Sequence, residues 1–199
     1  MMVYKKHFFK DYDPQIHDWD PPTIRRFDGK DVVGRYTKGY GSSVFMYAGK
    51  KYHPQEWTTP MSIIKSAAEA LVYGCTDKKV RFTFCLCGLY QNGSVSIPHH
   101  SDTVPTLDDI VVSISFGSTR LFEWHEYDQD IKNRSDTSET CITSEFFEEL
   151  KPVEVRRFLL EDGDVFIFDG HSQMRSTHAV PPIEQSSGER VNLTFRTGL

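Results

Sequence analysis

The sequence lacks a long apolar segment, a zinc-type cysteine pair and an excess of positive charge. None of its hydrophobic runs is long enough to cross a bilayer, and residues 1–10 are polar and aromatic, unlike a secretion signal. The four cysteines form no CxxC motif, which argues against structural zinc and favours free thiols in a reducing compartment. We therefore expect a soluble, monomeric, intracellular protein without membrane contact, in the cytoplasm or the nucleus.

Charge and aromatic content indicate which partners and which kind of core the protein can have. The formal net charge is −5, whereas nucleic-acid binders are more often basic, so such a partner would need a local basic patch. The chain has 14 Phe and nine Tyr, which suits a β-rich core and stacking surfaces. At 199 residues the length suits one domain with a substantial core.

The first third of the chain is predicted to contain a leader, a loop and a helix. Residues 1–31 are rich in Asp, Pro and aromatics and predict an irregular leader packed on the core, with a short strand. The glycine-punctuated segment Gly34–Gly41 predicts a mobile loop, and Val44–Tyr47 a strand. Apolar residues at helical spacing after Pro60 predict a helix that ends at Gly74.

The remainder predicts a mostly β fold. Short apolar or alternating runs separated by Gly and Asp turns indicate a double-stranded β-helix (a jelly roll, cupin-like) with flanking helices. We expect one domain over 32–199, interrupted at about 126–152 by an acidic, Ser/Thr-rich insertion with a short helix at Ser144–Leu150. The predicted strands are Arg81–Tyr90, Asp109–Phe116, Arg120–Trp124, Val155–Leu160, Asp164–Phe168, Ser176–Val180 and Arg190–Phe195.

The triplet His100-Ser101-Asp102, together with His178, is a candidate metal site. Two imidazoles and one carboxylate fill three positions of an octahedral metal and leave three open, as non-haem Fe(II) oxygenases require. Residues two apart share a strand face, so Asp102 selects His100 over His99, which faces the other way. The motif alone is weak, because about one His-x-Asp/Glu is expected by chance in such a composition. His171 has no carboxylate at suitable spacing and is interpreted as a rim or structural residue.

A second candidate group lies near the carboxyl end. Arg190 and Arg196 are six residues apart and share a strand face, and a planar guanidinium matches a carboxylate in a bidentate manner. They are suited to gripping a dicarboxylate. The alternative is that both arginines pair with surface acids on an edge strand.

These motifs resemble, in order, the AlkB-type nucleic-acid dealkylating dioxygenases. The resemblance runs from about Val33 to Arg196. It rests on Asn92-Gly-Ser through His100-Ser101-Asp102, on Val112-Ser-Ile-Ser-Phe116-Gly, on Trp57-x-x-Pro60, and on Arg190-x-Asn192-Leu-Thr194-Phe-Arg196.

The resemblance implies an enzyme that uses Fe(II), O2 and 2-oxoglutarate. His100, Asp102 and His178 would hold the metal, and Arg190, assisted by Asn192 and Tyr90, the distal carboxylate of 2-oxoglutarate. Arg196 would lie near the metal-proximal carboxylate and Asp102, with Thr194 lining the same site. The implied reaction demethylates N-alkylated bases of DNA or RNA and releases succinate, CO2 and formaldehyde.

Recognition of the nucleic acid, as a single strand or a flipped base, is expected to involve a lid at about 33–58. Phe45 and Tyr47 are the candidate stacking residues, with Trp57 behind them, and Arg35 and Lys38 the candidate phosphate contacts. For each, the alternative is an ordinary core aromatic or a solvated cation. The chain departs from the family at Gly88, where an Asn is common, and at Thr103-Val104, where acidic residues are usual.

Two other functions remain open. One is 2-oxoglutarate-dependent hydroxylation of a protein side chain or small molecule, suggested by the acidic charge and the missing pocket acids. The other is a non-enzymatic binding module that keeps the fold.

Overall fold

The computed structural model describes residues 1–22, 24–27, 30–47, 50–102, 104–131, 140–141, 150–183 and 188–197. For 24–27, 30–33, 45–47, 50–52 and 140–141 it describes the backbone alone. The predicted acidic insertion lies mostly outside these residues, and so does its expected helix except for Leu150, which is buried.

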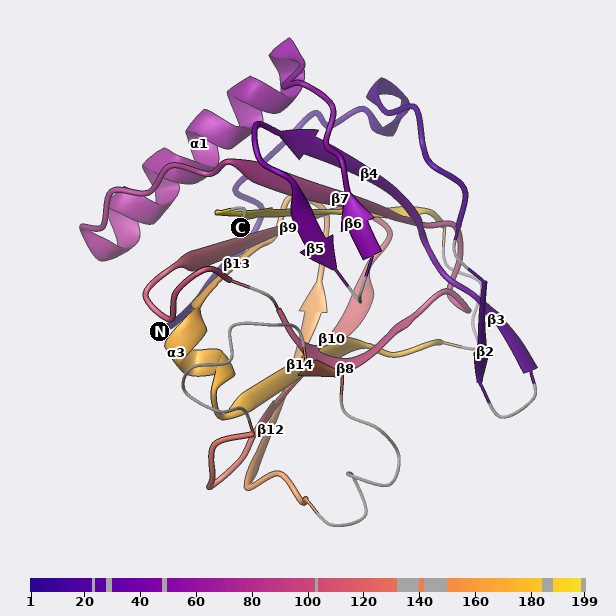
Figure 1. Cartoon of the computed structure of the whole chain (residues 1–199), viewed down its shortest axis with the longest axis vertical. Coiled ribbons are helices and arrows are strands. Elements are labelled where there is room, and N and C mark those ends of the chain that lie inside the picture. The colour runs from indigo at the N-terminus through magenta and orange to yellow at the C-terminus, as the bar shows by residue number, and fades with distance from the viewer. Residues whose placement is uncertain are drawn as a thin grey trace.

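Two antiparallel sheets form the core, which confirms the predicted jelly roll (Figure 1). The larger sheet has the order β1-β13-β9-β15-β7-β4, and the smaller one β11-β8-β14-β10-β12. The larger sheet contains β1 (Met2–Lys5), β4 (Tyr36–Gly41), β7 (Phe84–Tyr90), β9 (Ile110–Gly117), β13 (Val165–Asp169) and β15 (Arg190–Arg196). The smaller one contains β8 (Ile97–Ser101), β10 (Arg120–Glu126), β11 (Thr140–Cys141), β12 (Glu154–Leu160) and β14 (Ser176–Val180).

Two hairpins and three helical segments complete the described fold. The hairpins are β2 (Ile24–Phe27) with β3 (Lys30–Val33), and β5 (Phe45–Tyr47) with β6 (Lys50–Tyr52). The helical segments are η1 (Pro14–Ile16), α1 (Thr59–Thr76) and α3 (Gly170–Gln173).

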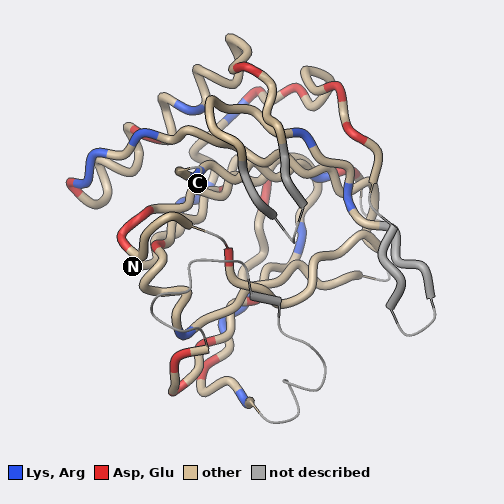
Figure 2. The backbone as a smooth tube through the Cα atoms, viewed as in Figure 1, with Lys and Arg blue, Asp and Glu red and all other residues tan. Residues whose placement is uncertain are grey.

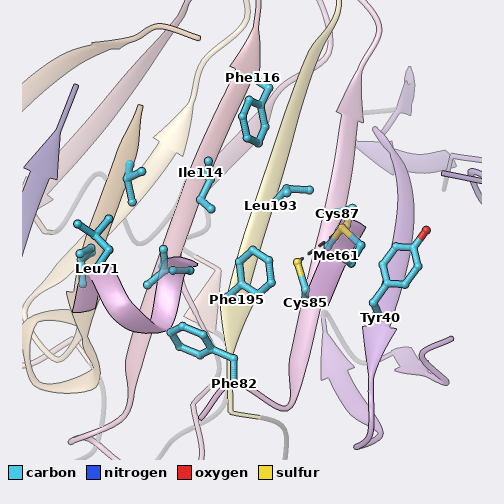
Figure 3. Packing of buried hydrophobic residues seen from close by; sticks show 14 of the residues in the cluster. Tyr40, Met61, Leu71, Phe82, Cys85, Cys87, Ile114, Phe116, Leu193 and Phe195 are labelled. Carbon is cyan, nitrogen blue, oxygen red and sulfur yellow. Dashed lines mark hydrogen bonds between the residues drawn. The ribbon is translucent and has the colours of Figure 1, made fainter. Parts of the chain in front are cut away.

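Helix α1 covers the outer face of the larger sheet and confirms the predicted helix. The side chain of Thr58 caps its first turn by accepting from the N–H of Met61, and Asp77 ends it in the left-handed conformation. Its apolar stripe packs on side chains from β7, β9 and β15, such as Ile114, Leu193 and Phe195 (Figure 3). The opposite face of the sheet is thereby left to form the interior of the barrel.

The predicted mobile loop at Gly34–Gly41 is wrong, because most of this segment is strand β4. It pairs with β7 along its whole length, and Thr37 to Gly41 are buried. The glycines are needed for close approach: a Cβ on Gly41 would lie 2.2 Å from the carbonyl oxygen of Thr83, and one on Gly39 would lie 3.3 Å from the Phe84 ring. The glycine pattern therefore reflects tight packing between strands.

The leader is more regular than expected. The predicted short strand is present as β1, which pairs with β13 at the edge of the larger sheet. Further along, His17 is buried and hydrogen-bonds through its ring nitrogens with the hydroxyls of Tyr12 and Tyr40. The leader is thus fastened to β4 by a buried imidazole.

This imidazole predicts an acid-sensitive attachment of the leader. Burial, helped by the charge of Lys38, lowers the pKa of His17 to about 4 from 6.5. The unfolded chain therefore takes up a proton first, so stability present above pH 6.5 is lost as the pH falls toward 4. Between pH 6.5 and pH 4 the wild type should lose free energy of unfolding, and we expect His17→Gln to reduce this loss by on the order of 2 kcal/mol. Urea unfolding at the two pH values measures the difference. Equal pH dependence in the two proteins would contradict this.

The structure also bears on the expectations about membrane-spanning segments and cysteines. No helix in the described part of the chain is long and apolar enough to cross a bilayer. Cys75, Cys85 and Cys87 are free thiols, and the last two lie side by side on β7 with their sulfur atoms 3.9 Å apart.

Candidate active site

The three predicted metal ligands meet inside the barrel. His100 on β8 lies directly opposite His178 on β14, and Asp102 follows β8 by one residue. The Nε2 atoms of His100 and His178 lie 3.8 and 3.7 Å from the two carboxylate oxygens of Asp102. All three side chains are buried and can each present one ligand atom within 4.8 Å of the others. Their arrangement therefore suits one metal ion.

Hydrogen bonds and ring contacts hold these ligands in place. The Nδ1 of His100 donates to the carbonyl oxygen of Pro98 at 2.8 Å, which leaves Nε2 as a lone-pair donor to a metal. The His178 ring stacks on Trp124 at a centroid distance of 5.9 Å and an angle of 10°. The backbone N–H of Asp102 donates to Oε1 of Gln173 at 2.5 Å.

The charge state of the ligands also suits a cation. Burial alone raises the pKa of Asp102, but Arg196 and the two histidines outweigh it and hold this pKa far below its usual range. Burial, with the nearby His100, lowers the pKa of His178 well below its usual value. The site therefore offers an ionised carboxylate and a neutral imidazole, the forms that bind metals.

Most of the predicted co-substrate residues line the same cavity as the metal ligands. Arg196 donates from Nη2 to Oδ1 of Asp102 at 3.1 Å, as the resemblance implies. The cavity is lined by Arg35, Tyr90, Ile97, His100, Asp102, Ser113, Phe122, Phe168, His178, Val180, Asn192, Thr194 and Arg196. The cavity therefore combines cationic and hydroxyl groups with the three predicted metal ligands.

Arg190 lies behind this lining, against Tyr90 and Asn192. Its Nη2 donates to Ser115 Oγ and Asn192 Oδ1, both at 2.8 Å, and its guanidinium carbon lies 4.8 Å from the centre of the Tyr90 ring. Its Nε and Nη1 have no hydrogen-bond partner, and no carboxylate pairs with it, within the described parts of the chain. Burial lowers the pKa of Arg190 to about 10, so it remains charged at neutral pH. The alternative of surface ion pairs on an edge strand is wrong, because β15 is central and both arginines are buried.

Arg35 occupies a place that differs from the predicted phosphate contact. It points into the cavity, where Nη1 donates to the Tyr90 hydroxyl at 2.9 Å. Its stem fills the space above Gly88, since a Cβ there would lie 2.7 Å from Cδ of Arg35. Gly88, noted as a departure from the family, thus makes room for a guanidinium.

The other predicted substrate residues are not part of this cavity. Lys38 is buried and pairs with Asp20 at 3.2 Å, so its ammonium group already has an acidic partner and is hardly accessible to a phosphate. Trp57 packs on the core and stacks on Phe195, with ring centroids 6.2 Å apart. The side chains of Phe45 and Tyr47, and Thr103, lie outside the described residues, while Val104 is buried in the core.

Gln173 was not among the predicted site residues, and Arg35, predicted as a phosphate contact, lies at the cavity beside Tyr90. Gln173 lies on α3, five residues before His178, and supports the backbone of Asp102. No motif pointed to it, because a four-residue helix has no detectable periodicity. For Arg35 the only signal was the missing side chain at Gly88.

Comparison with known proteins shows the family of the chain. The family model of the 2OG-Fe(II) oxygenase superfamily matches residues 15–196. The chain belongs to this superfamily. The AlkB-type resemblance is confirmed by relatives such as human alpha-ketoglutarate-dependent dioxygenase alkB homolog 3, 32% identical over 182 residues, which make up 90% of this chain and 57% of that protein. DNA oxidative demethylase ALKBH2 of Arabidopsis thaliana is 25% identical over 94% of this chain and 60% of its own length. The chain thus spans less than two thirds of these curated relatives.

A solved structure, "The structure of OsALKBH1", shares the fold of this oxygenase chain. It has a TM-score of 0.65 at 19% identity and covers 98% of this chain and 96% of its own.

The residues present fit the groups that the superfamily name implies. The donor set of two imidazoles and a carboxylate suits ferrous iron. Nε2 of His100 is available to the metal because Nδ1 makes the hydrogen bond to Pro98. The buried guanidinium of Arg190, with donors unused by the described residues, suits a carboxylate such as that of 2-oxoglutarate.

Proposed function

We propose that this chain oxidatively demethylates N-alkylated bases of DNA or RNA with Fe(II), O2 and 2-oxoglutarate. The main observation behind this proposal is that the cluster of His100, Asp102 and His178 shares one cavity with Arg35, Arg196 and Asn192. Relatives named as an alkB homolog and a DNA oxidative demethylase support the nucleic-acid substrate. We also propose an intracellular monomer that meets its substrate as a single strand or a flipped base.

In this proposal the protein binds, orients and shields. His100, Asp102 and His178 hold iron, and Gln173 fixes the backbone of Asp102. Arg196 keeps the Asp102 carboxylate ionised and faces the carboxylate of 2-oxoglutarate nearest the metal. When bound, iron and the keto acid supply the oxidising chemistry that hydroxylates the N-methyl carbon, and the product then releases formaldehyde. The rings of Trp124, Phe122 and Phe168 around His178 exclude water.

The proposed partners of the distal carboxylate of 2-oxoglutarate surround Tyr90. Tyr90 stands between Arg35 and Arg190, and burial, which raises its pKa, is outweighed by these two charges, which lower it. Such a surplus of buried positive charge favours a bound dianion. We propose that Arg190 pairs with the distal carboxylate, with Tyr90, Asn192 and Thr194 beside it, while Arg35 supplies the donor that Gly88 lacks.

This role of Arg35 predicts matched effects of two changes. Arg35→Met removes the guanidinium, and Gly88→Ala displaces it with a methyl group. Each should weaken binding of 2-oxoglutarate about 10- to 150-fold, since a hydrogen bond to a charged group contributes about 1.5–3 kcal/mol. The measurement is calorimetric titration of the manganese-loaded protein without oxygen. The double variant should bind no more weakly than Arg35→Met, and full additivity of the two effects would contradict the shared role.

The basic residues in the described part of the chain are spread along the fold. Figure 2 shows basic segments spread over α1, the connection after it and the interior, with acidic segments between them. Weak, local phosphate contacts fit this distribution better than a continuous stripe. Base stacking by Phe45 and Tyr47 stays a prediction.

A direct test supplies methylated oligonucleotides to the iron-loaded protein. We expect release of formaldehyde, and a loss of about 14 mass units (one CH2) from the oligonucleotide, when single strands contain 1-methyladenine or 3-methylcytosine. Succinate formation without formaldehyde from any methylated DNA or RNA would overturn the nucleic-acid proposal and favour hydroxylation of a protein or small molecule. Absence of any 2-oxoglutarate turnover by folded protein would favour a binding module.

A further inference from the structure

A second group of metal-binding side chains lies on the outer face of the smaller sheet. His99 on β8 precedes His100 and faces the opposite way, and Glu123 and His125 flank Trp124 on β10. The three side chains are half-buried and can each present one ligand atom within 4.8 Å of the others. This is the same closeness as in the His100, Asp102 and His178 cluster.

The sheet register explains why these residues meet. Strand β14 runs between β8 and β10, and its Thr177 is opposite His125. Because His178 is opposite both His100 and Trp124, the neighbours of these residues point to the other face of the sheet. His99, Thr177 and His125 share that face, and the rings of His99 and His125 have centroids 3.8 Å apart.

Polar contacts fix the side chains of this group and leave one nitrogen unused. Nδ1 of His99 hydrogen-bonds with Thr177 Oγ1 at 3.1 Å, and its Nε2 lies 3.7 Å from Oε2 of Glu123. The other carboxylate oxygen, Oε1, accepts from Nε of Arg157 at 2.7 Å, which fixes the carboxylate. Nδ1 of His125 is buried and has no hydrogen-bond partner in the part of the chain described. An enclosed imidazole nitrogen without a partner is costly unless a ligand satisfies it.

We propose that His99, Glu123 and His125 bind a zinc ion on the outer face of the smaller sheet. Two imidazoles and a carboxylate, with water as a fourth ligand, match the tetrahedral coordination that zinc prefers. Ligand distances of about 2.0–2.2 Å require the three side chains to close in by small rotations. The ion would tie β8 to β10 across β14, directly behind the strand that carries His100, and so act as a structural brace. The proposal does not depend on the proposed demethylation.

The test counts the zinc ions that remain after dialysis against metal-free buffer. Zinc also fits the inner cluster, so we expect two equivalents for the wild type and one for His125→Ala, measured by elemental analysis. His171→Ala is the matched control, because it removes an exposed histidine whose side chain pairs with Asp108. It should retain two equivalents. One equivalent in the wild type, or the same count in His125→Ala as in the wild type, would overturn the proposal.

A second readout separates the two clusters. His178→Ala should retain one equivalent, and zinc should raise its thermal unfolding midpoint, whereas His125→Ala/His178→Ala should retain none and show no shift. Loss of all zinc from folded His178→Ala would also overturn the proposal. If His178→Ala does not fold, the comparison of wild type with His125→Ala decides alone.

Discussion

Replacing His100 by Ala is expected to reduce 2-oxoglutarate turnover by about a thousandfold or more. The metal contributes several kcal/mol of transition-state stabilisation, and each 1.36 kcal/mol is a factor of ten in rate. In the proposed site His100 is one of three ligands found among the described residues, and its Nε2 is oriented by the Nδ1 bond to Pro98. Succinate formation under saturating iron is the measurement.

The matched control for this change is His171→Ala. His171 is exposed on α3 and pairs with Asp108, outside the cavity lining. We expect its turnover to stay within a factor of about two of the wild type, because surface changes away from the site are nearly neutral. Equal turnover of His100→Ala and His171→Ala would contradict the assignment of the metal ligand.

Replacing Arg190 by Met is expected to weaken 2-oxoglutarate binding by about 30- to 1000-fold. Truncating one partner of a buried charge pair costs about 2–4 kcal/mol, because the other charge is left without its partner. Calorimetric titration of the manganese-loaded protein without oxygen measures this loss apart from turnover. Arg175→Met is the control, since Arg175 is exposed and pairs with Asp130.

The stability of the same variant distinguishes binding from a structural role. The ligand-free protein carries Arg190 as a buried cation without a carboxylate partner among the described residues. Arg190→Met should therefore leave the free energy of unfolding within about 1 kcal/mol of the wild type, despite the two lost hydrogen bonds. Strong destabilisation together with unchanged 2-oxoglutarate affinity would mean that Arg190 only supports the fold.

Local periodicity was enough to predict the helix and the pairing of residues two apart. The apolar spacing after Pro60 gave α1, and the His-x-Asp spacing selected His100 over His99. Likewise, the six-residue separation predicted that Arg190 and Arg196 share a strand face, and both are buried on β15. These features depend on geometry within a single element, which a sequence encodes directly.

Features that depend on contacts between distant segments were harder to predict. Gly39 and Gly41 indicated a loop, but they allow β4 to approach Phe84 and Thr83. Lys38 was predicted to contact phosphate because the residues around it in the sequence do not reveal that it is buried beside Asp20. Arg35 reaches Tyr90 only because a strand 53 positions further on carries glycine at residue 88, which the sequence does not link to it.

The most direct test of the central claim is optical titration of the protein with Fe(II) and 2-oxoglutarate in the absence of oxygen. A keto acid chelated to ferrous iron beside His100, Asp102 and His178 absorbs visible light by charge transfer from metal to ligand. The account predicts that this absorption appears and saturates at one equivalent of each, and that His100→Ala abolishes it while His171→Ala does not. Folded wild-type protein that develops no such absorption would contradict the account.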